Sequence, residues 1–265
     1  TDSLHGHKAR KRFGQNFLED DNVINNIVHA IAPQVGDNMV EIGPGLAALT
    51  RFLLPACQKL HVVELDRDLA ARLPNTLAGL GELHLHQADA LNFDFAQLAS
   101  IEHPLRIVGN LPYNISTPLI FHLLSFSHIV KDMIFMLQKE VVDRLAGEPS
   151  TADYGRLSVM VQYRCQVDWL LDVPPEAFNP PPKVQSAVVR LTPWQNSPYN
   201  CQNETLLQHI VSTAFNQRRK TLRNCLKGLA EDADFIAVDI DPSLRAEVLS
   251  VQQFVQLTNQ LNRHV

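Results

Sequence analysis

Short apolar runs, rich in β-branched or aliphatic residues, alternate with stretches of helical periodicity from about residue 20 to 137. Parallel strands need helix-sized connections and are covered on both faces. The alternation therefore predicts an α/β fold with a mostly parallel, Rossmann-like sheet. The expected strands are 38–42, 60–65, 83–88, 105–110 and 133–138, and the expected helices are 46–57, 66–77 and 117–126.

The pattern changes after residue 138. Two more strands are expected at 159–171 and 186–193, separated by the Pro-rich loop 173–184, which makes seven in all. From Glu204 onward the apolar residues fall at helical spacing. We therefore expect a second, all-α domain after a polar linker. The expected domains are 1–193 for the sheet, 194–203 for the linker and 204–265 for the helices.

The composition excludes several classes of protein. Of the 265 residues 45% are apolar, enough for a sizeable core and too many for a wholly disordered chain. No apolar run reaches the roughly 18 residues of a membrane span, and no apolar segment follows the charged N-terminus as in a signal peptide. The four cysteines form no CxxC pair, which indicates reduced thiols. A cytoplasmic protein without membrane contact is the simplest expectation.

The net charge of −5 does not by itself indicate nucleic-acid binding, but the basic residues are clustered. Two basic clusters stand out, Lys8, Arg10, Lys11 and Arg12 near the N-terminus, and Arg218, Arg219, Lys220, Arg223 and Lys227 near the C-terminus. They form an RNA-facing side if the fold brings them together. Charge alone favours two solvated faces.

A glycine turn, Gly43-Pro44-Gly45, lies between the strand 38–42 and the next helix. Such a turn lets a ligand approach the backbone closely. Glu64 ends the next strand, 21 positions after Gly43, a spacing that suits a carboxylate holding ribose hydroxyls. Folds that bind dinucleotides and folds that bind S-adenosylmethionine share this layout.

Three details favour S-adenosylmethionine over a dinucleotide. Glu41 precedes the first glycine, where it would repel a pyrophosphate but suit the cofactor's ammonium group. Pro44 removes one N–H donor from the loop, and Ala48 replaces the third glycine of the dinucleotide pattern. Asp89 follows the third strand, where its carboxylate can accept from the cofactor's adenine amine, although an isolated Asp there is more often a helix N-cap.

The fourth strand ends in Asn110-Leu111-Pro112-Tyr113, at the edge where ligands bind in such sheets. The exocyclic amine of adenine is a poor nucleophile because its lone pair is delocalised into the ring. The Asn110 side-chain oxygen and the Leu111 carbonyl could accept its two N–H groups, with Pro112 holding the turn rigid. Tyr113 could stack on the base, and Phe178 could close the other face of a base swung out of its stack.

Several segments together resemble the KsgA-type small-subunit rRNA adenine dimethyltransferases, and the likeness covers nearly the whole chain. The segments are RFGQNFL (12–18), VEIGPGLAALT (40–50), VVELD (62–66), QADAL (87–91), GNLPYNISTPL (109–119), QKEVVDRL (138–145), YGRLSV (154–159), FNPPPKV (178–184) and FNQRRKTLRNCL (215–226). The resemblance implies a seven-stranded methyltransferase domain with a small helical C-terminal domain. It also implies dimethylation of two adjacent adenosines near the 3′ end of 16S rRNA, in the assembling small (30S) subunit, during ribosome biogenesis.

The resemblance also assigns roles to residues. Asn16 and Leu18 would meet the methionine end of S-adenosylmethionine, Gly43 would line it, Glu64 would hold its ribose, and Asp89 would bind its adenine. Asn110 would touch both the cofactor and the target amine, and Tyr113 and Phe178 would enclose the target base. Arg218, Arg219, Lys220 and Arg223 would lie near RNA, where basic side chains contact phosphates. No metal is implied, and His84 and His86 are interpreted as one polar strand face.

Three alternatives remain. A related adenine methyltransferase of the erythromycin-resistance (Erm) type would act on large-subunit rRNA, but the segments at 178–184 and 215–222 favour the small-subunit type. A non-catalytic assembly or transcription factor could keep the fold and the RNA binding, although it would have no need for an intact 110–113 motif. A nicotinamide dehydrogenase shares the strand–glycine–helix layout, and Pro44 argues against it.

Overall fold

The structure, a computed structural model, describes residues 16–265, so the basic cluster at 8–12 lies outside the described residues. The chain forms two compact units. Among the described residues, the sheet unit contains 16–142 and Asp168–Pro193, and the helical unit contains Asp143–Val167 and Trp194–Val265. Residues 143–167 thus group with the C-terminal helices, whereas the sequence pattern places them in the sheet domain. The expected division into domains at residue 193 stays a prediction.

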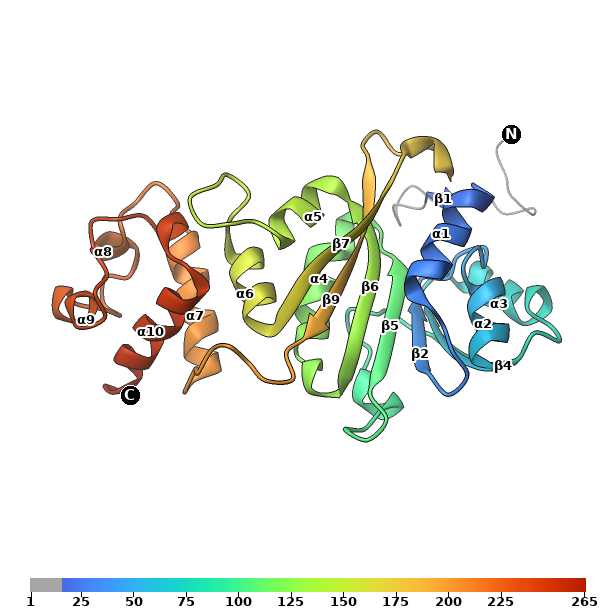
Figure 1. The fold of residues 1–265 in the computed structure, drawn as a ribbon, viewed down its shortest axis with the longest axis horizontal. Helices are drawn as coiled ribbons and strands as arrows, with labels where there is room; N and C mark the ends of the chain where they lie inside the picture. The colour runs from blue at the N-terminus through green and yellow to red at the C-terminus, as the bar shows by residue number, and fades with distance from the viewer. Residues whose placement is uncertain (1–15) are drawn as a thin grey trace. The chain divides into compact units, whose positions relative to one another are not determined.

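The sheet unit is built on one seven-stranded sheet (Figure 1). The strand order is β4-β3-β2-β5-β6-β9-β7, parallel from β4 to β6 and antiparallel between β6 and β9. The predicted seven-stranded, mostly parallel sheet is confirmed. The strands are β2 (Asn38–Ile42), β3 (Lys59–Glu64), β4 (Glu82–Gln87), β5 (Leu105–Asn110), β6 (Val130–Gln138), β7 (Cys165–Val173) and β9 (Ser186–Pro193). The short strands β1 (Phe17–Leu18) and β8 (Phe178–Asn179) pair separately and antiparallel.

Helices cover the sheet because each presents an apolar stripe to it. Ile24, Ile27 and Ile31 of α1 pack in one buried cluster with Met39 of β2 and Val62 of β3. The helices of this part are α1 (Asp21–Ile31), α2 (Thr50–Cys57), α3 (Arg67–Thr76), α4 (Tyr113–Leu124) and α5 (Lys139–Leu145). The short 3₁₀ helices of the sheet unit are η2 (Phe95–Leu98), η3 (Ser127–Ile129) and η4 (Pro175–Ala177), and η5 (Ala246–Val248) belongs to the helical unit.

The segment 156–164 is a helix, α6 (Arg156–Arg164), so the predicted strand over 159–164 is wrong and β7 begins at Cys165. Most of α6 is buried, so its sequence lacks a polar face and resembles a continuous buried strand. The start of α6 is held by a hydrogen bond from the Gly155 backbone N–H to Ser158 Oγ, at 3.1 Å. The Ser158 hydroxyl in turn donates to the Arg144 carbonyl, at 2.5 Å.

The predicted helical C-terminal part is confirmed. Buried side chains of α7 (Glu204–Phe215), among them Leu207, Ile210 and Val211, share the core of the helical unit with Phe254 and Leu257 of α10 (Val251–Asn262). The Tyr154 hydroxyl donates to the Leu249 carbonyl at 2.6 Å, within this same unit. Its further helices in this part of the chain are α8 (Leu222–Cys225) and α9 (Asp232–Ala237). Within residues 16–265, no helix is both long enough and apolar enough to cross a bilayer.

Three imidazoles gather on one face of the β3–β4 pair. The ring of His61 lies 4.8 Å from that of His84 and 5.4 Å from that of His86, centre to centre. His61 Nδ1 and His86 Nε2 are 3.2 Å apart. No group of three or more potential ligands in residues 16–265 is arranged to hold a metal ion. The absence of a metal cofactor stays a prediction.

These imidazoles predict a loss of stability in mild acid. Burial, followed by the neighbouring histidines, lowers the pKa of His61 from its usual 6.5 to about 4. Burial also lowers the pKa of His86. Both folded-state pKa values lie below the unfolded value. The contribution of the two histidines to the free energy of unfolding is therefore complete above pH 6.5 and is lost as the pH falls toward 4. We expect the urea midpoint to fall from pH 7 to pH 5, and to fall less in His61→Gln. An equal fall in both proteins would contradict this origin.

Candidate active site

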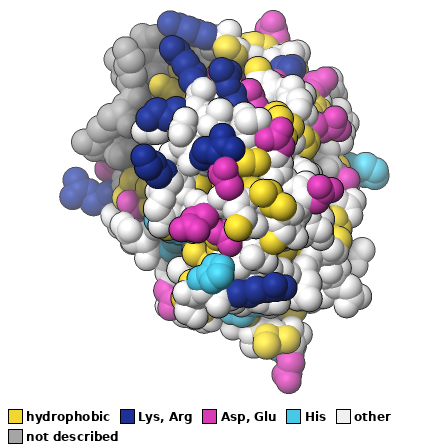
Figure 2. Space-filling model, turned by 90° about the vertical axis from the view of Figure 1, so that its left-hand side faces the viewer, with side chains coloured by type: hydrophobic (Ala, Val, Ile, Leu, Met, Phe, Trp, Pro, Cys, Tyr) yellow, Lys and Arg dark blue, Asp and Glu magenta, His cyan; other side chains and the backbone are white. Residues whose placement is uncertain are grey.

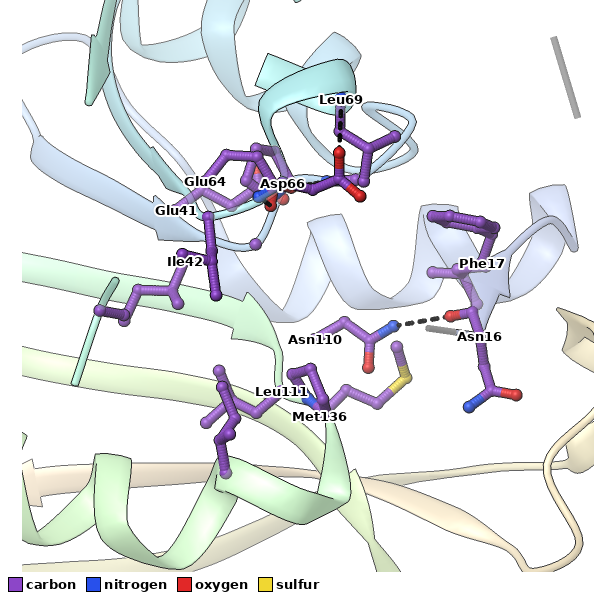
Figure 3. A pocket seen from close by; sticks show the side chains of 18 of the residues that line it. Asn16, Phe17, Glu41, Ile42, Glu64, Asp66, Leu69, Asn110, Leu111 and Met136 are labelled. Atoms are coloured by element: carbon purple, nitrogen blue, oxygen red, sulfur yellow. Dashed lines mark hydrogen bonds between the residues drawn. The ribbon is translucent and has the colours of Figure 1, made fainter. Parts of the chain in front are cut away.

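One cavity lies at the carboxyl ends of the parallel strands, within the sheet unit (Figure 3). Side chains from the glycine turn, from the ends of β3 and β5, and from β1 and β8 line it. All the residues predicted for the cofactor and the target base meet there. They are Asn16, Leu18, Gly43, Glu64, Asp89, Asn110, Leu111, Pro112, Tyr113 and Phe178. The strand ends therefore assemble the site that the sequence spacing predicts, although the role of each residue stays a prediction.

The glycine turn curves tightly beneath the cavity. Gly43 and Gly45 have φ values of +64° and +58°, in the left-handed region that favours glycine. The Gly43 N–H donates to the Val63 carbonyl at 2.8 Å, which ties the turn to β3. A Cβ atom at Gly45 would lie 3.4 Å from the ring of Phe17. The turn thus brings the backbone to the cavity wall without a side chain in the way.

Glu64 is held in position by the backbone around it. Its Oε1 accepts from the Gly45 N–H at 3.1 Å, and its Oε2 accepts from the Asp66 N–H at 3.0 Å. Burial raises the pKa of Glu64, while these backbone donors lower it. Each carboxylate oxygen keeps capacity for a further donor. The carboxylate is thus fixed at the cavity wall and can accept from the hydroxyls of a ribose.

Glu41 is a deeply buried acid of the cavity. Its side chain is 2% exposed, and its Oε1 accepts from the Thr50 hydroxyl at 2.5 Å. Burial raises the pKa of Glu41 to about 7, and the nearby Glu64 raises it as well. A ligand with a further negative group, such as a pyrophosphate, is disfavoured next to two buried carboxyls, whereas a ligand with a cationic group is favoured. The site therefore fits an ammonium-bearing cofactor better than a pyrophosphate.

Asp89 and Leu65 form the wall beyond β3 and β4. Asp89 Oδ1 accepts from the Leu91 N–H at 3.0 Å, so part of its role is to cap a local turn. Its other oxygen accepts no hydrogen bond from a residue of the described chain and can take an amine donor. Leu65 is 49% exposed and lines the cavity, where it offers an apolar surface to a planar ring. Leu65 was not predicted from the sequence, because an apolar residue at the end of a strand does not show by its type whether its side chain points into the core or into a cavity.

Asn110 and Leu111 present two acceptors to the cavity. The Asn110 amide nitrogen donates to the Asn16 carbonyl at 3.4 Å, so its Oδ1 points the other way (Figure 3). The Leu111 N–H donates to the Met136 carbonyl at 3.1 Å, which anchors the turn to β6. Neither Asn110 Oδ1 nor the Leu111 carbonyl accepts a hydrogen bond from any residue in 16–265. The structure thus holds two adjacent oxygens ready for donors from a ligand.

Tyr113 and Phe178, the two aromatic residues predicted to enclose the target base, differ in exposure. Tyr113 begins α4 and is 63% exposed, so its ring is available for stacking. Phe178 is 5% exposed, pairs with Leu18, and packs in the same apolar cluster as Met136. Phe178 also lines the cavity. It is therefore in part a core residue, and its stacking on a base stays a prediction.

The basic residues expected to bind RNA lie in the helical unit and are not equivalent. The Arg218 guanidinium donates to the Tyr154 carbonyl and lies 5.7 Å over the Phe215 ring. Arg223 pairs with Asp232 at 2.9 Å. The exposed side chains of Arg219 and Lys220 have no polar partner within residues 16–265. Figure 2 shows Lys and Arg side chains gathered toward one part of the face drawn. Arg219 and Lys220 are thus the freer candidates for phosphate contacts.

The seven-stranded sheet, the glycine turn and the acidic strand ends define an S-adenosylmethionine-dependent methyltransferase fold. The chain belongs to the family described as ribosomal RNA adenine dimethylase, whose model matches residues 6–263. This membership sets the dehydrogenase alternative aside.

The relatives of this chain are similar over nearly its full length. It is 59% identical to "Ribosomal RNA small subunit methyltransferase A" of Saccharophagus degradans, over 98% of this chain and 97% of the relative. It is 60% identical to the protein of the same name in Acinetobacter baylyi, over 97% and 93% of the two chains. A solved dimethyladenosine transferase from Plasmodium falciparum has a TM-score of 0.81 at 25% identity, over 93% of this chain and 98% of that one. The 23S rRNA methyltransferase ErmE shares the fold, with a TM-score of 0.70 at 23% identity, over 93% and 100%.

Proposed function

We propose that this protein uses S-adenosylmethionine to dimethylate the exocyclic amines of two adjacent adenosines near the 3′ end of 16S rRNA. The observation that carries the proposal is the pair of acceptors, Asn110 Oδ1 and the Leu111 carbonyl, in one cavity with Glu41, Glu64 and Asp89. The acidic residues suit a cationic nucleoside cofactor. The acceptors suit the two N–H groups of an amine.

The residues of the cavity fit S-adenosylmethionine. Glu64 would hold the ribose hydroxyls, and Asp89 would accept from the adenine amine beside the apolar surface of Leu65. Glu41 and Asn16 also line the cavity, and the Glu41 carboxyl would favour the ammonium group of the cofactor's methionine part. When bound, the cofactor supplies a methyl group on a positively charged sulfur that leaves as a neutral thioether.

The chain's own contribution is to position and activate the amine. Asn110 Oδ1 and the Leu111 carbonyl accept its two N–H groups, which localises the nitrogen lone pair that the ring otherwise withdraws. Tyr113 stacks on the extruded base and holds it at the cavity mouth. The methylated amine loses its proton to water, so the mechanism requires no general base. Correct placement of the amine supplies most of the remaining rate enhancement.

The substrate is proposed from the relatives, whose printed name refers to small-subunit ribosomal RNA. We place the reaction on the assembling small (30S) subunit during ribosome biogenesis, and therefore in the cytoplasm. To test this, the protein would be given labelled S-adenosylmethionine with unmodified small subunits or with large subunits. Label is expected in small-subunit RNA alone. Label in large-subunit RNA would favour the Erm-type reaction, and binding without transfer would favour a non-catalytic factor.

Arg219 and Lys220 are expected to contact RNA phosphates. The double variant Arg219→Gln/Lys220→Gln should weaken binding to small subunits and reduce the slope of log K against log salt by roughly 1 to 2. The matched control replaces Arg51 and Lys131, exposed cations of the sheet unit, by Gln. Binding titrations at several salt concentrations measure both slopes. Equal slopes for the two variants would place the phosphate contacts elsewhere.

A further inference from the structure

Two polar residues at the end of the β6–β9 pair line the same cavity and have no part in the site described so far. Gln138 ends β6 and Ser186 begins β9. They are register partners in the antiparallel pair, so their side chains lie side by side on one face. Both residues line the cavity, and Ser186 is only 6% exposed.

This pair lies next to the acceptors that receive the amine. Asn110 pairs with Met136 in the parallel register of β5 and β6. Gln138 lies two residues beyond Met136 and so projects from the same face of the strand. The Lys139 N–H donates to the Gln185 carbonyl at 2.9 Å, which holds the two strand ends together. The sheet therefore carries both residues, with Gln138 one strand away from Asn110 and Ser186 two strands away.

Neither side chain makes a hydrogen bond to another residue of the described chain. In this they resemble Asn110 Oδ1, and they differ from Glu64, whose two carboxylate oxygens both accept from backbone N–H groups. Ser186 is buried and Gln138 is half-buried, and a polar group that is withdrawn from water is costly unless a partner satisfies it. An amide and a hydroxyl that lack protein partners inside a ligand cavity indicate that the ligand supplies the partner.

We propose that the Gln138–Ser186 pair donates a hydrogen bond to a ring nitrogen of the target adenine and so determines the choice of base. The proposal rests on the proposed function. When Asn110 and Leu111 accept both amine hydrogens, the two ring nitrogens that flank the amine, N1 and N7, are both acceptors. Glutamine matches the amine and N7 of adenine in other nucleic-acid complexes. Guanine would instead bring a carbonyl oxygen against the acceptors, and cytosine would leave the cavity underfilled.

The test combines a protein change with a substrate change. Small subunits would be reconstituted with 16S rRNA whose 3′ segment carries adenosine, 1-deazaadenosine or 7-deazaadenosine at the two target positions. Wild-type protein and Gln138→Met would be compared on each. With adenosine, Gln138→Met is expected to lower kcat/KM by about 5- to 100-fold, because a buried acceptor loses its donor. The melting temperature and the affinity for S-adenosylmethionine should not change, which separates a contact with the base from a structural role.

The deciding result is whether the two changes act on one contact. One of the two deaza substrates should lower the kcat/KM of the wild-type protein by a similar factor. The same substrate should cause no further loss of kcat/KM in Gln138→Met. Ser186→Ala should show the same behaviour to a smaller extent. Independent, multiplying losses with both analogues, or unchanged activity of Gln138→Met, would overturn the proposal. Failure of the proposed function would look different, since wild-type protein would then not methylate the adenosine substrate at all.

Discussion

Replacement of Asn110 by alanine is expected to lower kcat for methyl transfer by about 100- to 1000-fold, the effect of removing one pre-organised group from a charge-stabilising site. The physical reason is the orientation of the amide. Its nitrogen is held by the Asn16 carbonyl, which directs Oδ1 toward the cavity as an acceptor. Without this acceptor one amine N–H loses its partner, and the nitrogen lone pair is again delocalised into the ring, which makes the amine a poorer nucleophile. Single-turnover transfer to small subunits, at saturating cofactor, measures the loss.

A neighbouring amide provides the control for this variant. Asn114 lines the same cavity from the first turn of α4, and its side chain is exposed. Asn114→Ala should keep kcat within a few-fold of wild type. Both variants should bind S-adenosylmethionine with nearly unchanged affinity in calorimetry. Normal turnover of Asn110→Ala, or an equal loss in Asn114→Ala, would contradict the acceptor mechanism.

Arg106→Met is expected to lower the free energy of unfolding by roughly 3–5 kcal/mol, the cost of removing one partner from a buried ion pair. The Arg106 side chain is 9% exposed and bonds Asp132 through Nε at 3.0 Å and Asp37 through Nη1 at 2.9 Å. Its Nη2 also donates to the Ile31 carbonyl at 2.6 Å. Methionine fills a similar volume but leaves two largely buried carboxylates, 15% and 14% exposed, without their cation. Urea unfolding followed by fluorescence measures the change.

The chain supplies a matched pair at the surface. Arg223 contacts Asp232 through Nε and Nη2, the same two-point geometry that joins Arg106 to Asp132. The side chains of Arg223 and Asp232 are 52% and 54% exposed. Solvent screens such a pair, so Arg223→Met should cost far less stability than Arg106→Met. Similar losses in the two variants would show that burial is not the source of the effect.

The central strands could be predicted because each is a short apolar run bounded by polar residues. The runs at β2 and β5 match their observed bounds, and the residues that follow them, such as Gly43 and Leu111, necessarily reach the ligand-binding edge of the sheet. The segment 159–164 could not be assigned in this way. Its helix is buried nearly all round, so the polar face that distinguishes a helix from a strand is missing.

The remaining parts of the site depend on contacts between distant segments. Gln138 and Ser186 meet only because β6 and β9 pair antiparallel, a register that no local pattern in the sequence shows. Arg218 has the same local pattern as Arg219, yet its guanidinium is held by the Tyr154 carbonyl, 64 positions earlier in the chain. Basic residues can be counted from sequence, but those that support the fold are separated from those free for RNA only by such contacts.

The most direct test of the account is nucleoside analysis of small-subunit RNA after complete reaction with this protein and S-adenosylmethionine. Unmodified small subunits would be used, and the RNA would be digested and its nucleosides measured by mass spectrometry. The expected result is N6,N6-dimethyladenosine at two adjacent positions near the 3′ end of 16S rRNA, with no other modified nucleoside gained. Methylation of a different base, methylation of a ring nitrogen instead of the amine, or no methylation at all would contradict it.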